Sequence, residues 1–183
     1  MKAKLAAGAL YAALLAVAAF AYAAEPNGFR DVPWGTSEET LRLRIPTQSC
    51  GEVDGTVEFG TRRCRARNDI RFGTVTPAAV FFYFRNDMLV AWRLTSYPRL
   101  RATLAKTLIQ QYGQPSVVYK GEHVAWKGGT SDVDFVGGAG SDVVEAVTKA
   151  ELVTREAERE ERARRAASAP SRPASATPGS GGR

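Results

Sequence analysis

The segment "AVFFYFRNDMLVAWRLTSY" (79–97) constrains the fold of this chain more than any other. Two runs of aromatic and β-branched residues flank "RND" (85–87), a turn-forming break, and this pattern is typical of a β-hairpin. Alternate residues of each run share one face of a strand, so the hairpin should have one strongly apolar face. The residues expected there are Val80, Phe82 and Phe84 in the first strand and Val90, Trp92 and Leu94 in the second.

Strand patterns recur on both sides of this hairpin. In "CRARNDIRF" (64–72) uncharged residues alternate with charged ones, which predicts a half-buried strand with one face toward water. More strands are expected in the second half of the chain, with a hairpin turn at Gly128-Gly129. Their expected ranges are 116–120, 122–127, 130–136 and 142–148.

A helix is expected before each group of strands. The first follows Trp34-Gly35, where glycine lets the chain turn and the indole can pack on the core. It should begin with a capping box of Thr36 and Glu39 and end before Pro46. The second is expected over 98–115, where apolar side chains recur at intervals of four. These side chains are Leu100, Leu104, Leu108 and Tyr112.

The order helix, strands, helix, strands indicates a diverged tandem repeat of one helix-plus-meander unit. Each unit is too small to cover its own apolar face. We therefore expect an α+β fold in which an antiparallel meander sheet packs against two helices.

The two ends of the chain differ in composition from this domain. Lys2 and Lys4 precede an Ala/Leu-rich run with small residues at its end, which predicts a secretory signal peptide cleaved after Ala23. Retention of this segment as an anchor is the alternative. Without it, 23 basic residues stand against 19 acidic ones, a net charge of +4 that permits an anionic partner without requiring one. The expected division is signal peptide 1–23, α+β domain 25–149, charged solvated helix 150–167 and disordered tail 168–183.

The chain contains two cysteines, Cys50 and Cys64. The signal peptide predicts a periplasmic or secreted location, and in an exported chain this even count predicts one disulfide. No metal site is expected, because two thiols and the single His123 fall short of four zinc ligands. After signal cleavage we expect no transmembrane helix.

A run of arginines is the densest charge feature of the domain. Arg63, Arg65, Arg67 and Arg71, with Arg62 beside them, could bind the phosphates or carboxylates of phospholipid, lipopolysaccharide or cell-wall polymer. The simpler interpretation is a solvated strand face whose charges discourage edge pairing. Nucleic acid is not expected as a partner, because no aromatic stacking platform interleaves with these arginines.

Candidate catalytic groups are sparse. Asp132 and Asp134, with Asp142 near, suggest a metal or acid–base pair, but they fit the wet face of a strand whose buried face carries Val133. His123 lies at a strand start, and no Gly-x-Ser-x-Gly elbow supplies a nucleophile. We expect no catalytic residue and no cofactor, and a small hydrolase is the least favoured class.

The aromatic residues supply most of the packing mass of so small a sheet. Trp34, Trp92 and Trp126 are expected as core or half-buried anchors. If one of them is exposed beside Phe81 or Tyr83, the group would mark a protein-binding patch.

Three segments resemble small bacterial periplasmic proteins of mostly unknown activity. "FRDVPWGTSEETLR" (29–42) resembles their Phe-x-x-x-x-Trp-Gly-x-Ser opening, and 81–97 and 108–135 resemble later segments. The helix-then-meander repeat is similar to β-lactamase inhibitor proteins and to BamE-like outer-membrane lipoproteins, although no lipidated cysteine is present. The resemblance implies a binding function without catalytic residues. We therefore expect an exported, non-enzymatic module that binds an unidentified envelope protein, with an anionic envelope surface as the alternative partner.

Overall fold

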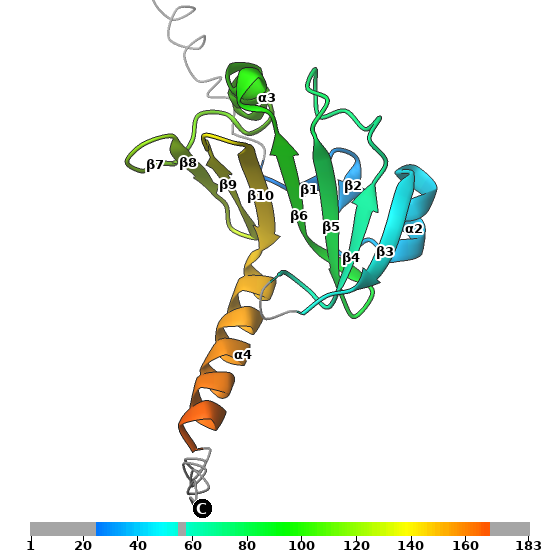
Figure 1. The fold of residues 1–183 in the computed structure, drawn as a ribbon, viewed down its shortest axis with the longest axis vertical. Helices are drawn as coiled ribbons and strands as arrows, with labels where there is room; N and C mark the ends of the chain where they lie inside the picture. The colour runs from blue at the N-terminus through cyan, green and yellow to red at the C-terminus, as the bar shows by residue number, and fades with distance from the viewer. Residues whose placement is uncertain (1–24, 55–57, 169–183) are drawn as a thin grey trace, which may run out of the picture.

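The computed structural model describes residues 25–54 and 58–168 and has an α+β architecture (Figure 1). An antiparallel sheet has the strand order β3-β4-β5-β6-β10-β9-β8-β7, and β1 and β2 form a separate two-stranded sheet. The strands are β1 (Gly28–Phe29), β2 (Val32–Pro33), β3 (Thr47–Glu52), β4 (Arg62–Ala66), β5 (Ala79–Arg85), β6 (Met88–Ser96), β7 (Val117–Val118), β8 (His123–Lys127), β9 (Ser131–Val136) and β10 (Asp142–Thr148). The α-helices are α2 (Glu38–Arg44), α3 (Arg101–Tyr112) and α4 (Lys149–Ser168), and the 3-10 turn η1 (Pro98–Leu100) leads into α3.

The predicted tandem repeat is confirmed by the order of the elements. Helix α2 precedes the meander β3 to β6, and helix α3 precedes the meander β7 to β10. The two meanders join where β6 pairs with β10 in antiparallel register, with Leu94 opposite Val144. One continuous sheet of eight strands therefore forms from two four-stranded units.

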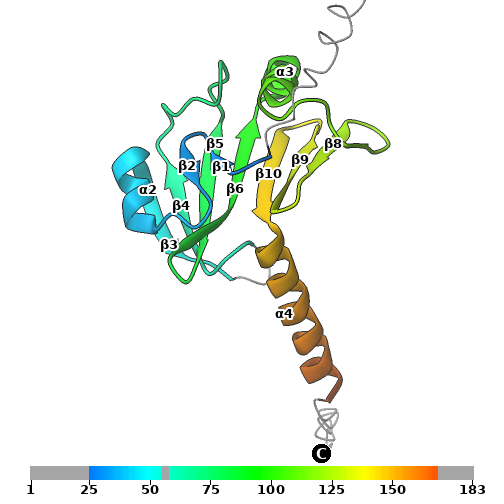
Figure 2. The same ribbon diagram turned by 180° about the vertical axis from the view of Figure 1, so that it is seen from behind.

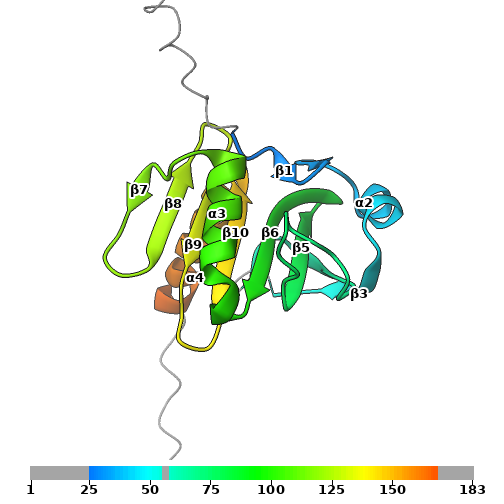
Figure 3. The ribbon, with the colours of Figure 1, turned by 90° about the horizontal axis from the view of Figure 1, so that it is seen from above.

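One face of the sheet carries the main core. Helix α2 and the small β1–β2 sheet lie over the first meander, and α3 passes over the second (Figures 2 and 3). Phe29 lies at the centre, with its ring 5.1 to 5.7 Å from those of Phe72, Phe82 and Trp92. The helices contribute Leu41, Leu104 and Leu108, all of which are fully buried. The strands supply most of the remaining buried side chains, including Val80, Phe84, Leu94, Val133 and Val144.

The predicted hairpin is confirmed as β5–β6, but the prediction that Val90 lies on its apolar face was wrong. Asn86 and Asp87 both have positive φ, at 51° and 60°, and form the two-residue turn between the strands. The pairing register of β5 and β6 shifts between Tyr83 and Phe84, which changes the residues of β6 that face the core near the turn. Leu89 is consequently the buried residue near the turn, and Val90 is only half-buried.

The strand predicted over 64–72 was wrong in its second half. Strand β4 ends at Ala66, and the chain then leaves the sheet in a loop. Phe72 is still buried, because it forms an isolated bridge with Val75 and packs against Phe29. Strand β3 was not predicted, since its sequence "TQSCGE" has no apolar alternation.

The start of the first helix also differs from the prediction. Ser37, not Thr36, is the N-cap of α2, and its hydroxyl accepts a hydrogen bond from the Thr40 backbone N–H. The Thr36 hydroxyl instead donates to the Pro33 carbonyl. Asp87 of the β5–β6 turn accepts from the Glu38 N–H, so the hairpin supplies a second cap to the helix.

We expect Ser37→Ala to lower the free energy of unfolding by about 1 kcal/mol, because the side chain that caps Thr40 is lost. Urea denaturation of Ser37→Ala and Thr36→Ala compares the two candidate caps. An equal or larger loss in Thr36→Ala would contradict this assignment.

Helix α4 begins directly after β10 and extends away from the sheet (Figure 1). Its last residues, from Arg162 to Ser168, are exposed. The predicted signal peptide, 1–23, and all but the first residue of the predicted tail, 168–183, lie outside the described residues. No helix within the described ranges combines the length and apolar character needed to cross a membrane.

Candidate functional site

The face of the sheet opposite the main core carries half-buried side chains on β4, β5, β6 and β10. They alternate along each strand with residues that are buried in the core, as Phe81 alternates with Val80 and Phe82. We call this surface the open face. It consists of Arg63, Arg65, Phe81, Arg93, Thr95, Val143 and Glu145.

The strand register aligns the open face into a lateral row. Arg65 pairs with Phe81, Phe81 with Arg93, and Arg93 with Glu145. The row continues through Asp134 on β9. Its charge therefore changes sign across the sheet, from basic on β4 and β6 to acidic on β10 and β9.

Phe81 lies at the centre of the basic half. The guanidinium carbons of Arg63 and Arg65 are 5.0 and 5.9 Å from its ring centroid, within the range of cation–π attraction. The sequence argument that no aromatic residue interleaves with the arginines was therefore wrong. Interleaving arises from pairing between strands, which sequence spacing does not display.

The cations of the open face differ in their acidic partners. Arg63 pairs with Glu58 at 2.6 Å and Arg93 with Glu145 at 2.5 Å. Within the described part of the chain, Arg65 has no ion pair, and its buried Nε has no hydrogen-bond partner. Arg65 is therefore the cation of the open face that is best placed to receive an external carboxylate or phosphate.

The other predicted anion-binding residues do not join this face. Arg67 and Arg71 follow the end of β4, where both are exposed. Arg62 points to the opposite side of β4 and pairs with Glu38 of α2 at 2.9 Å. The arginine run is therefore divided among two sheet faces and a loop.

The end of the sheet next to α4 holds a second, smaller core. It consists of Phe59, Tyr83, Ala91 and Val147, with Phe81 and Leu152 packed against it. The ring of Phe59 meets that of Tyr83 edge-on at 5.6 Å, and Arg155 of α4 lies 4.5 Å from the Phe59 centroid. Tyr83 is consequently buried and cannot contact a partner directly, whereas Phe81 remains at the border of the open face.

We expect Tyr83→Phe to raise the free energy of unfolding by about 1 kcal/mol, because the buried hydroxyl has no hydrogen-bond partner among the described residues. Burial raises the pKa of Tyr83 to about 12. Because the folded state disfavours the ionised phenol, stability does not depend on this group below the ordinary tyrosine pKa and falls as pH rises from about 10 toward 12. Thermal unfolding measured across this range should show a smaller alkaline loss for the variant. A destabilised variant would mean that the hydroxyl has a partner.

The three tryptophans are anchors of the fold. Trp92 is fully buried and its Nε1 donates to the Gly28 carbonyl at 2.9 Å. Trp34 and Trp126 donate in the same way to the carbonyls of Pro26 and Gly113, each at 2.9 Å. They tie connecting segments to the core and do not form an exposed patch with Phe81.

A buried carboxylate fixes the base of α4. Glu151 is 1% exposed and accepts hydrogen bonds from Arg85 Nε and from the Gly60 N–H, each at 2.7 Å. Arg85 also pairs with Glu158, which lies about two turns further along α4. Glu151 belongs to the helix that was predicted to be solvated, and its long-range partners are not visible in the local sequence pattern.

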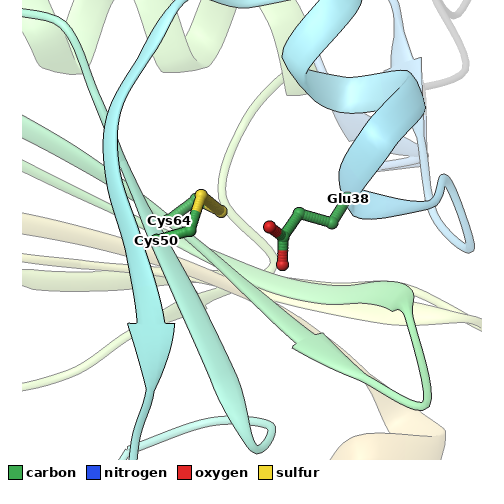
Figure 4. Close-up of side chains that lie close together, drawn as sticks. All are labelled: Glu38, Cys50 and Cys64. Carbon is green, nitrogen blue, oxygen red and sulfur yellow. A yellow bond between two sulfur atoms is a disulfide. The ribbon is translucent and has the colours of Figure 1, made fainter.

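The predicted disulfide is confirmed. Cys50 and Cys64 are directly opposite in the β3–β4 register and are bonded. A carboxylate oxygen of Glu38 lies within 4.8 Å of the two sulfurs (Figure 4). Because the sulfurs are joined to each other, this trio presents no thiolates as metal ligands, and Glu38 instead forms its ion pair with Arg62.

The acidic residues that were considered for catalysis form ion pairs. Asp134 contacts His123 Nε2 at 3.1 Å and Lys127 Nζ at 3.1 Å, while Asp132 contacts Lys149 Nζ at 2.7 Å. Asp142 lies apart from them and pairs with Arg101 at 2.9 Å. Asp132 and Asp134 do lie on one strand face, as predicted, and lysines balance their charges. The prediction that this face is solvated was wrong for Asp132, which is 5% exposed because Lys127 and Lys149 cover it.

Comparison of the chain with family models, with curated proteins and with solved structures finds no match. The resemblance of the segment that opens at Phe29 to small periplasmic proteins therefore stays a prediction. In the structure its Phe29 is the centre of the core and its Ser37 is the helix cap.

Proposed function

We propose that this protein is an exported, non-enzymatic binding module of the cell envelope that contacts a partner protein through its open face. The observation that carries the proposal is the row from Arg65 through Phe81 and Arg93 to Glu145. Arginine and aromatic side chains are enriched at the centres of protein interfaces. Here the row lies beside a pair of smaller side chains, Thr95 and Val143, and includes Arg65, which has no ion pair in the described part of the chain.

The change of charge sign favours a protein partner over a polyanion. A phospholipid surface or an anionic polymer presents one sign of charge and would need several free cations, but Arg93 of the row is already paired with Glu145. A protein surface can match both halves, which gives register and specificity. The neutralisation of Arg63 by Glu58 further reduces the cationic density that a polyanion would need.

Export is proposed on the predicted signal peptide together with the disulfide. Disulfides persist in oxidising compartments, so the Cys50–Cys64 bond is compatible with the periplasm or the exterior. The resemblance to small bacterial periplasmic proteins points to the same location.

Photo-crosslinking in cells tests the proposal. A crosslinking residue at Thr95 lies on the open face, and a matched one at Thr103 is exposed on α3 at the other side of the sheet. We expect one envelope protein to be captured from position 95 and not from position 103, and Thr95→Arg expressed as competitor should fail to displace it. Capture that is equal from both positions would overturn the proposal.

The alternative partner is tested with vesicles that contain anionic phospholipid. If the mature chain binds these vesicles at physiological salt and Arg65→Glu abolishes the binding, the anionic surface is favoured. Exposed charges act over only about 8 Å at this salt concentration, so such a loss would mean that Arg65 itself lies near the surface. Such binding, without capture from position 95, would replace the proposed function by the alternative.

A further inference from the structure

We propose that the partner binds partly as an extended acidic segment that adds a ninth strand to the sheet at the free edge of β3. This inference rests on the proposed function and assigns the mode of recognition. Addition of a strand to an exposed edge uses main-chain hydrogen bonds for affinity and neighbouring side chains for specificity.

The two edges of the sheet are unequal. Strand β7 has two residues, whereas β3 has six. Four of these six residues, Gln48, Ser49, Gly51 and Glu52, are exposed. In the described part of the chain, the only backbone ladder of β3 is the one with β4, so its other edge is open for pairing.

A covalent bond holds this edge in place. The Cys50–Cys64 disulfide joins β3 to β4 at directly paired positions in the middle of the strand. Helix α2 supports the same pair from the core side, where Leu41 and Ile45 are buried. An edge that is already ordered loses little conformational freedom when a further strand pairs with it.

The side chains beside the edge favour acidic residues in the incoming strand. Ser49 and Gly51 lie opposite Arg65 and Arg63 in the register, and both are small. Arg63 already pairs with Glu58, so Arg65 is the cation that can attract an acidic side chain. A side chain added at Gly51 would meet nothing within 4 Å, so the surface above β3 is open. A new strand would lie two strand spacings, about 10 Å, from β4. A glutamate on it and the extended Arg65 can span this distance across Ser49.

A second copy of the chain fits the same edge poorly. On the open face β3 carries the uncharged Ser49 and Gly51, so pairing with β3 of another molecule would give Arg65 no acidic partner. The predicted tail is rich in proline, which lacks the N–H that a strand needs. An acidic strand from a different protein therefore fits best.

A set of synthetic peptides tests the inference. The probe is the capped peptide Thr-Glu-Val-Glu-Val-Glu-Thr, compared with its lysine counterpart and with two versions that are N-methylated at alternate residues, one on each edge. We expect the acidic peptide to bind the mature, oxidised chain and to slow amide exchange in β3. One methylated version should lose at least tenfold in affinity and the other should retain it, because only one peptide edge pairs with β3.

Charge reversal supplies the matched controls. Arg65→Glu should weaken binding of the acidic peptide at least tenfold and improve binding of the lysine peptide. Arg42→Glu, which makes the same change on exposed helix α2, should leave both affinities within twofold. Equal affinity of the two methylated versions, or dimerisation of the chain through β3, would overturn the inference. If a crosslinker at Thr95 still captures a protein in that case, strand addition at β3 is wrong and partner binding through the open face is retained.

Discussion

Replacement of Glu151 by alanine is expected to lower the free energy of unfolding by about 3 kcal/mol, because it leaves buried polar groups without their partner. Arg85 would lose its principal carboxylate, and the Gly60 N–H would lose its acceptor. Arg85 keeps Glu158, which is why the expected loss lies at the low end of the range for broken buried ion pairs.

Urea denaturation measures this loss, and the same helix provides a control. Glu161 forms exposed ion pairs with Arg164 and Arg165, and Glu161→Ala should change stability by less than about 0.5 kcal/mol. Amide exchange should also show that α4 opens more readily in Glu151→Ala than in Glu161→Ala. Equal effects of the two substitutions would mean that Glu151 is not the attachment of α4 to the domain.

Reduction of the Cys50–Cys64 disulfide is expected to lower the free energy of unfolding by about 3 kcal/mol, because the unfolded chain regains the freedom of a loop of about 15 residues. The affected element should be the edge strand β3, whose backbone ladder in the described part of the chain is the one with β4.

Comparison of the oxidised and reduced forms of the same chain isolates the cross-link from side-chain packing. Urea midpoints should separate the two forms, and amide exchange in β3 should accelerate in the reduced form. The double variant Cys50→Ala and Cys64→Ala should show no further response to reductant. Identical midpoints for the oxidised and reduced chain would contradict the stabilising role of the bond.

Features that depend on neighbouring residues could be predicted from the sequence. The β5–β6 hairpin, the α3 helix and the repeat of helix and meander follow from alternation, from intervals of four and from turn residues. The alternation after Ala66 was misleading, because it continues into a loop whose Phe72 is buried through contact with Phe29. The local sequence pattern cannot distinguish burial on one face of a strand from burial of a loop residue by a distant contact.

Most of the features missed in the sequence depend on contacts between distant segments. Capping of Glu38 by Asp87 and burial of Glu151 beside Arg85 join residues far apart in the chain. The open face likewise arises from register, which sets Arg65, Phe81 and Arg93 in one row. Charged residues are usually solvated, so a sequence gives no reason to expect these partners.

The central claim is that the open face of this disulfide-braced sheet binds a protein. The most direct measurement is calorimetric titration of the partner captured from position 95 with Thr95→Arg and with Thr103→Arg. We expect Thr95→Arg to weaken binding at least a hundredfold and Thr103→Arg to bind as the unmodified chain does. Equal affinity of the two variants, or a loss confined to Thr103→Arg, would contradict the claim.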